Sequence, residues 1–180
     1  MNENIKKLRN NESECVKIAR LSVEHFAKHK KVLSDYKVNN PQFLNSKAGV
    51  FVSIHKSNQL RGCIGTIQAT KESIVEEIIA NAISAANNDP RFYRVEYNEL
   101  DELEYKVDIL GGIEEVDDTT KLDVYRYGVI VSYLGRRALL LPNLEGINTV
   151  EEQLSIVCKK AGISVDSPYK LSRFEVVRYK

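Results

Sequence analysis

The stretch Leu60-Arg61-Gly62-Cys63-Ile64-Gly65-Thr66 decides the fold prediction, because it lies in the second of two neighbouring strand patterns. Residues 50–55 predict a first β-strand, opened by Gly49, and residues 60–67 predict a second. The connection between them, residues 56–59, consists of Lys, Ser, Asn and Gln, which is polar and of hairpin length. We therefore expect the two strands to pair as an antiparallel β-hairpin.

The second strand contains glycines on both sides of a cysteine, which is unusual because glycine weakens a strand. Gly62 and Gly65 flank Cys63, and such glycines often mark a bulge or a close approach to the backbone. One interpretation is a reactive cysteine in a notch that favours anions, with Arg61 on the same pleat face stabilising the thiolate. The alternative is a small buried thiol between glycines that let a helix pack closely, and the local sequence alone favours this alternative.

Three further segments have a helical pattern, and several more have a strand pattern. The helices are expected over residues 13–30, 73–86 and 149–161, with capping boxes at Ser73 and Thr149 and with Gly162 after the last helix. The strands are expected over residues 105–110, 128–134, 138–141 and 174–179. Hairpins among about six strands predict an α+β fold with a largely antiparallel sheet, and the polar residues 1–10 predict a disordered N-terminus.

Composition sets limits on the function of this chain of 180 residues. Its 26 Lys and Arg against 25 Asp and Glu give a net charge of +1, which provides no large field for nucleic acid or membranes. The three cysteines form no C-x-x-C pair and no zinc-like cluster, and no signal peptide or membrane-spanning run is visible. We therefore expect a cytoplasmic protein without a metal or other cofactor.

The turn Asp89-Pro90-Arg91-Phe92 follows the second predicted helix. Asp89 is suited to accept backbone N–H bonds in the turn, and Arg91 is suited to pair with a carboxylate or a ligand phosphate. Together with Arg61 and Cys63 these residues form a candidate polar site of thiolate, cation and carboxylate. The alternative is a turn that ends the helix and is held by an Asp–Arg bond, which turn chemistry alone favours.

Histidines and basic residues offer weaker candidates. His25 and His29 have metal-ligand spacing on a helix, but no third ligand is evident and the neighbouring lysines would repel a cation. The same basic cluster, with Arg136-Arg137, is suited to nucleic-acid phosphates, although a solvated surface explains it better.

His55 is a candidate general base for Cys63, but strand parity disfavours it. With a two- or four-residue connection, Cys63 lies opposite Val52 and His55 points to the other face. A three-residue loop would reverse this orientation, so the pair stays an open alternative.

Several stretches in order resemble the signature blocks of the AMMECR domain family, whose bacterial members are called AmmeMemoRadiSam system protein A. The resemblance covers residues 12–179, and the motif Leu60–Gly65 is its most specific part. The other blocks are Gly49–Ser53, Asp89–Phe92, Glu99-Leu100, Leu139–Pro142 and Lys160–Gly162. The resemblance implies one α+β domain over residues 11–180 with a larger and a smaller lobe, and a cleft lined by the glycine–cysteine motif. Residues 143–149 depart from relatives that carry a tryptophan there, so a role for that loop does not transfer.

The leading hypothesis is an enzyme, or an accessory to one, that handles a small polar or anionic ligand in this cleft. Cys63 and Asp89 would be the catalytic residues, as nucleophile or ligand contact and as orienter or base. The ligand would contact Arg61, Gly62, Ile64, Gly65 and Arg91. The alternatives are a non-catalytic partner of Memo-type and radical-SAM proteins, which the name of the family's system suggests, and a nucleic-acid-binding protein.

Overall fold

The structure is a computed structural model that describes residues 3–180. The helices are α1 (Glu3–Asn11), α2 (Glu14–His29), α3 (Gln42–Asn45), α4 (Ile74–Asn87) and α5 (Val150–Ala161), with 3-10 helices η1 (Tyr97–Glu102) and η2 (Thr119–Lys121). The strands are β1 (Val50–Lys56), β2 (Gln59–Gly65), β3 (Leu103–Val116), β4 (Gly128–Tyr133), β5 (Arg136–Leu140) and β6 (Lys170–Tyr179). This confirms the predicted α+β class, although α1 and α3 were not predicted.

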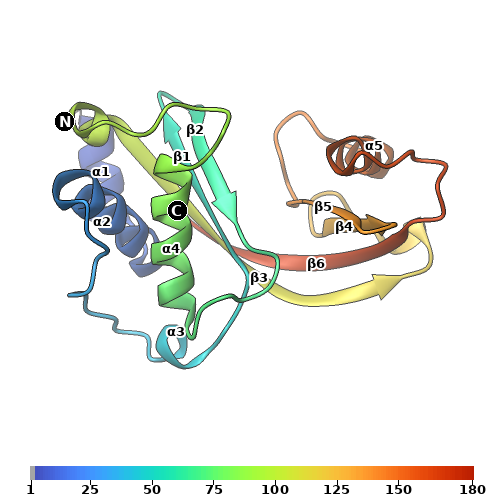
Figure 1. Cartoon of the computed structure of the whole chain (residues 1–180), viewed down its shortest axis with the longest axis horizontal. Coiled ribbons are helices and arrows are strands. Elements are labelled where there is room, and N and C mark those ends of the chain that lie inside the picture. Colours follow the sequence, from blue (N-terminus) through green and yellow to red (C-terminus); the bar gives the residue numbers. More distant parts are fainter. Residues whose placement is uncertain (1–2) are drawn as a thin grey trace. The chain divides into compact units, whose positions relative to one another are not determined.

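The strands form one six-stranded sheet in the order β2-β1-β3-β6-β4-β5, in which β2 and β5 are the edges (Figure 1). The pairs β1–β2, β1–β3, β4–β5 and β4–β6 are antiparallel. The chain divides into two compact units, a first unit of Met1–Ile109 with Arg178–Lys180 and a second unit of Leu110–Val177. The strands β3 and β6 each contribute residues to both units.

The first unit has a core between the β1–β2 hairpin and the helices. α4 contacts β1 and β2, and α2 in turn contacts α4 (Figure 1). Val52 and Ile54 of β1 are fully buried, as are Val75 and Ile78 of α4. The apolar residues of α4 form a broad arc, and buried residues lie on nearly every side of this helix.

Polar residues begin the helices where the sequence predicted. Ser73 accepts the backbone N–H of Glu76 at the start of α4, and Thr149 forms a capping box with Glu152 at the start of α5. Gly162 follows α5 with a φ of 67°, the left-handed conformation that glycine adopts at low cost. The predicted ends of α5 are therefore confirmed, whereas α4 has the N-cap at Ser73 without the reciprocal half of a capping box, because the Glu76 carboxylate accepts the N–H of Glu72 instead.

The N-terminal segment differs from the prediction of a disordered terminus over residues 1–10. The helix α1 covers Glu3–Asn11, and residues 1 and 2 lie outside the described part of the chain. Ile5 is buried, and the Arg9 guanidinium donates a 2.7 Å hydrogen bond to the carbonyl of Leu100. The polar composition of residues 1–10 gave no indication of these two tertiary contacts. Such contacts stabilise a helix that would be too short to form on its own.

The second unit has its own core between α5 and the strands β4 and β5. Val129, Val131, Val157 and Leu171 are buried there. Among residues 3–180, no helix is long and apolar enough to cross a membrane.

Candidate functional site

The β1–β2 hairpin contains a bulge that reverses the expected orientation of Cys63. Its turn has two central residues, Ser57 and Asn58, both with positive φ, and Lys56 pairs with Gln59. Further along, His55 pairs with Leu60 and Ile54 pairs with Gly62, so the intervening Arg61 lies opposite no residue of β1. This is the two-against-one arrangement of a β-bulge.

Because of this bulge, Cys63 pairs with Ser53 and not with Val52. Opposite residues of a strand pair share a face, so Cys63 lies on the face that carries Ser53 and His55. The prediction that His55 points to the other face from Cys63 is therefore wrong. The parity argument failed because it counted the loop residues correctly but assumed an unbroken ladder.

The two glycines of the motif are explained by close packing within the first unit. A Cβ at Gly62 would lie 2.3 Å from the carbonyl oxygen of Ala85 in α4, and one at Gly65 would lie 2.2 Å from the ring of Phe51. Gly62 lets α4 approach the strand, and Phe51 covers Gly65. Ile64, opposite Val52, packs against the core. These three positions shape the strand, and Cys63 between them is half-buried on the face turned away from α4.

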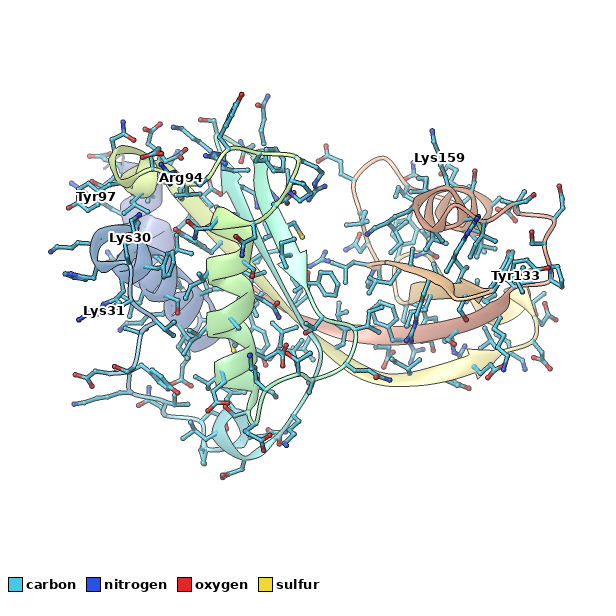
Figure 2. The ribbon with its side chains drawn as sticks, viewed as in Figure 1. Lys30, Lys31, Arg94, Tyr97, Tyr133 and Lys159 are labelled. Atoms are coloured by element: carbon cyan, nitrogen blue, oxygen red, sulfur yellow. The ribbon has the colours of Figure 1, made fainter. Side chains whose placement is uncertain are left out.

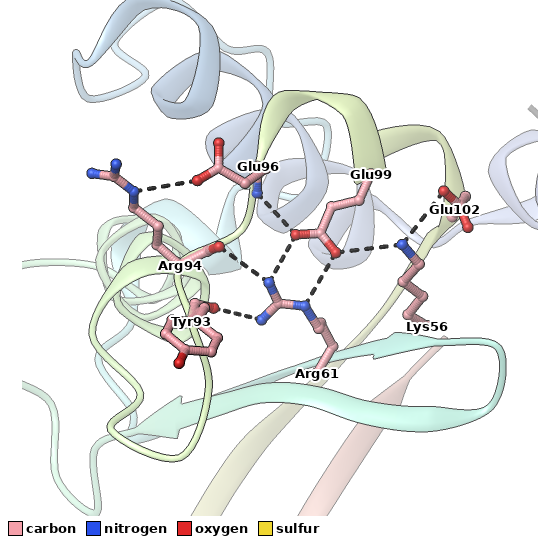
Figure 3. A network of polar contacts seen from close by, with 7 residues as sticks. All are labelled: Lys56, Arg61, Tyr93, Arg94, Glu96, Glu99 and Glu102. Carbon is pink, nitrogen blue, oxygen red and sulfur yellow. Dashed lines mark hydrogen bonds and ion pairs between the residues drawn. The ribbon is translucent and has the colours of Figure 1, made fainter.

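Arg61 is held in a polar network with residues that follow α4 (Figure 3). Its Nε and Nη2 donate to the two carboxylate oxygens of Glu99 at 3.1 and 2.8 Å. Its Nη1 and Nη2 also donate to the carbonyls of Tyr93 and Arg94, at 2.7 and 3.1 Å. All three nitrogens thus have protein partners, which favours a role in fixing the bulge over a role as a ligand contact.

Glu99 receives further cations and donors besides Arg61. Lys56 lies 3.6 Å from it, and the backbone N–H of Glu96 donates to it at 2.9 Å. Burial raises the pKa of Glu99, but the hydrogen bonds from Arg61 and Glu96 outweigh it and lower the pKa overall. The carboxylate is therefore ionised and bound at neutral pH.

Asp89 and Arg91 form a clamp on the backbone of Cys63. The Cys63 N–H donates to Asp89 Oδ2 at 2.8 Å, and Arg91 Nη2 donates to the Cys63 carbonyl at 3.4 Å. The two side chains are joined by hydrogen bonds of 3.0 Å from Nε and 2.7 Å from Nη2. Since β2 is an edge strand, the clamp satisfies backbone groups that a neighbouring strand would otherwise pair with.

The clamp sets the charge states of its members. Hydrogen bonds from Arg91 are the main reason why the pKa of Asp89 falls to about 2. A carboxylate this acidic is a poor proton acceptor at neutral pH, so the geometry favours Asp89 as an orienting group over a base. The same bonds raise the pKa of Arg91, and negative charge at Cys63 contributes in the same direction. The guanidinium is thus within electrostatic range of the thiol.

Glu77 of α4 holds the segment that follows the motif, and sequence reasoning missed it. This fully buried carboxylate accepts the hydroxyls of Thr66 and Thr70, at 2.7 and 2.9 Å. It also accepts the backbone N–H groups of Thr70 and Lys71, at 2.6 and 2.8 Å. The sequence could have identified Glu77, because it is a carboxylate among the apolar residues of a predicted helix. A buried carboxylate needs several hydrogen-bond donors.

The basic end of α2 gives no further support for a metal site. The rings of His25 and His29 lie 4.7 Å apart between centroids, and within residues 3–180 no group of three His, Cys, Asp or Glu is arranged to hold a metal ion. Lys30 and Lys31 extend outward beyond the helix end (Figure 2).

Comparisons with known proteins identify the family of this chain and similar folds. A Thermotoga maritima protein is 46% identical over 167 residues, covering 92% of this chain and 96% of its own length. A Clostridium acetobutylicum protein, CA_C1420, is 51% identical over 136 residues, covering 74% of this chain but only 28% of its own length. The crystal structure of the uncharacterised protein PH0010 from Pyrococcus horikoshii matches with a TM-score of 0.84 at 32% identity, over 91% of this chain and 88% of that one. The AMMECR1 family model matches residues 16–180, and the chain therefore belongs to the AMMECR1 family.

Proposed function

We propose that this protein binds a small anionic or polar ligand at Cys63 and acts on it as an enzyme or as an accessory to one. The observation that carries the proposal is the clamp, in which Arg91 is fixed beside the half-buried Cys63 by its bonds to Asp89. A fixed cation near a thiol favours the thiolate, which is the nucleophilic form. Cys63 would be the nucleophile or ligand contact, and Arg91 would stabilise negative charge.

The remaining motif residues have supporting roles in this proposal. Asp89 orients Arg91 and fixes the Cys63 backbone, while Arg61 holds the bulge through Glu99. Gly62, Ile64 and Gly65 keep the strand close to α4 and to Phe51. We place the reaction in the cytoplasm, where reducing conditions keep a thiolate available.

The rate at which Cys63 is alkylated tests the proposal. With iodoacetamide, we expect Cys63 to react with an apparent pKa well below about 8.5, the value of an ordinary thiol. Cys15 and Cys158 should react far more slowly, because both are buried and burial raises their pKa values. Arg91→Gln should raise the apparent pKa of Cys63, while Arg94→Gln, an exposed arginine in the same segment, should leave it unchanged. A Cys63 that reacts like an ordinary thiol, or one indifferent to Arg91→Gln, would remove the nucleophile.

One observation favours the accessory role over a self-sufficient enzyme. The C. acetobutylicum relative aligns over only 28% of its length, so a similar domain is covalently joined there to other sequence. We therefore keep a complex with Memo-type or radical-SAM proteins as the second candidate function. Purified candidates at micromolar concentration should form a complex that survives Cys63→Ser. No association in sedimentation or titration calorimetry would contradict this role.

A further inference from the structure

The sheet of the first unit carries a row of polar side chains on the face turned away from α4. Ser53 of β1 pairs with Cys63 of β2 on one side and with Lys106 of β3 on the other. Opposite residues of adjacent strands have Cα atoms about 5 Å apart, so the three residues form a continuous row across the strands. The next row on this face contains His55, two residues along β1.

The orientation of this row follows from the burial of its neighbours. Val52 and Ile54 alternate with these polar residues along β1 and are fully buried in the core against α4. Side chains of a strand alternate between faces, so Ser53 and His55 point the opposite way. Ser53, His55, Cys63 and Lys106 are each half-buried.

Among the described residues, three of these four polar side chains have a polar group without a protein partner. Among the described residues, the Ser53 hydroxyl and the Lys106 ammonium have no hydrogen-bond or ion-pair partner, and Nδ1 of His55 is a buried atom without one. Other charged groups on these strands are paired, namely Lys56 and Arg61 with Glu99 and Asp108 with Arg178 at 2.7 Å. For the buried Nδ1 of His55, the missing partner costs free energy that a bound acceptor would recover.

We propose that this row is the binding site for the charged group of the ligand at Cys63, and that the ligand carries a small oxyanion. The oxyanion accepts hydrogen bonds from Ser53 and Lys106, and His55 bounds the site as a neutral donor. This proposal rests on the proposed function at Cys63 and deepens it by naming the ligand class and the residues that select it. Lys106 supplies the positive charge that was first expected of Arg61.

The charges around the row restrict where the oxyanion lies. Burial is the main cause of a lowered pKa at His55, and the charge of Lys106 lowers it further, so the ring is neutral at neutral pH. In the row of His55, the neighbours are Leu60 of β2 on one side and Glu104 of β3 on the other. The carboxylate of Glu104 repels an anion from that end of the face. Asp108, opposite Phe51 in the row beyond Ser53, is neutralised by Arg178. The oxyanion is therefore confined to the space between Ser53 and Lys106, beside Cys63.

Paired alkylating reagents test the site without knowledge of the natural ligand. Iodoacetate carries a carboxylate and iodoacetamide does not, so the ratio of their rates at Cys63 reports attraction of the anion. Lys106→Gln should lower this ratio by about threefold or more, while Lys106→Arg should keep it within a factor of about two. Lys17→Gln makes the same charge change on the exposed surface of α2 and should leave the ratio unchanged. An unchanged ratio in Lys106→Gln would overturn the proposed site while leaving the reactive thiol intact.

A second measurement covers the case in which Cys63 does not react. The imidazole signals of His25, His29 and His55 can be followed by NMR during titration with inorganic phosphate, with sodium chloride at matched ionic strength as the control. The His55 signal, identified from His55→Gln, should move saturably with phosphate and should lose this response in Lys106→Gln. A His55 signal that ignores phosphate, or that responds equally in Lys106→Gln, would disprove the oxyanion site independently of thiol chemistry.

Discussion

At the residue scale, the side chain that organises Cys63 is the carboxylate of Asp89, two residues beyond the end of α4. Asp89 is 4% exposed and accepts the Cys63 N–H, the Arg91 N–H and two guanidinium donors. Such a carboxylate is strongly bound in its ionised form, because each donor interacts better with the anion than with the acid. Its protonation state therefore couples the geometry of Cys63 to pH.

Asp89→Asn tests this coupling through stability. The folded pKa of about 2 lies below the ordinary value of 3.8, so Asp89 stabilises the fold above pH 4 and loses that contribution as pH falls towards 2. The shift corresponds to about 2 kcal/mol at pH 7. We expect Asp89→Asn to lower the free energy of unfolding by about that amount at pH 7, and the deficit to shrink by about 1 kcal/mol at pH 3. Urea denaturation at both pH values measures it.

Asp35→Asn is the matched control, because it removes the same charge from an exposed side chain. It should change stability by less than about 0.5 kcal/mol at either pH. A deficit for Asp89→Asn that is as large at pH 3 as at pH 7 would show that the carboxylate contributes by packing and not by its charge.

The residue scale also shows where sequence reasoning reached the site and where it stopped. The turn chemistry of Asp89 and Arg91 predicted an Asp–Arg bond, and the structure contains that bond. It did not predict that the pair would hold the backbone of Cys63, because that contact joins residues 26 positions apart. Nothing in the local sequence marks Ser53 or Lys106 as a site residue, because a serine and a lysine are common on the surface of a strand. Only the strand register places them beside Cys63.

At the element scale, the β1–β2 hairpin depends on the close approach of α4. The carbonyl of Ala85 occupies the space that a Cβ at Gly62 would need, at 2.3 Å. Backbone atoms cannot move aside as a flexible side chain can, so the strand and the helix would have to separate. The glycine is thus fixed by helix packing, which was one of the two interpretations that the sequence offered.

Gly62→Ala should therefore destabilise the protein. We expect a loss of about 2 kcal/mol or more, because overpacking at a rigid contact forces the backbone to shift. For a chain of this size the midpoint of thermal unfolding should fall by roughly 4–8 °C. Gly112→Ala is the matched control, since nothing lies within 4 Å of a Cβ there. A Gly62→Ala variant as stable as Gly112→Ala in calorimetry would contradict the packing argument.

The elements themselves were largely predictable, and the register was not. Helix ends at Ser73 and Thr149 follow from local side-chain capping, which depends only on residues three positions apart. The extra residue of the bulge, Arg61, is bound through its guanidinium to Glu99, 38 positions away in the sequence. A one-residue bulge reverses the face of every later side chain, so the bulge sets which face carries Cys63.

At the scale of the whole molecule, two separate cores divide the chain. Among the described residues, the buried cluster of the first unit and that of the second share no member. The first includes Ile78 of α4, and the second includes Leu154 of α5. Units with independent cores can open separately, with a free energy below that of global unfolding.

Leu154→Ala should open the second unit selectively. Truncating a buried leucine costs about 2–4 kcal/mol, and the atoms that lose contact belong to the second core alone. In hydrogen exchange read by mass spectrometry, amides of α5, β4 and β5 should exchange faster, while those of α4 and β1 keep their protection. Ile78→Ala should give the reverse pattern, because Ile78 is fully buried in the first core. An equal rise in exchange across both units in either variant would mean that the molecule unfolds as one cooperative body. In that case, a ligand bound at Cys63 would stabilise α5 as strongly as α4.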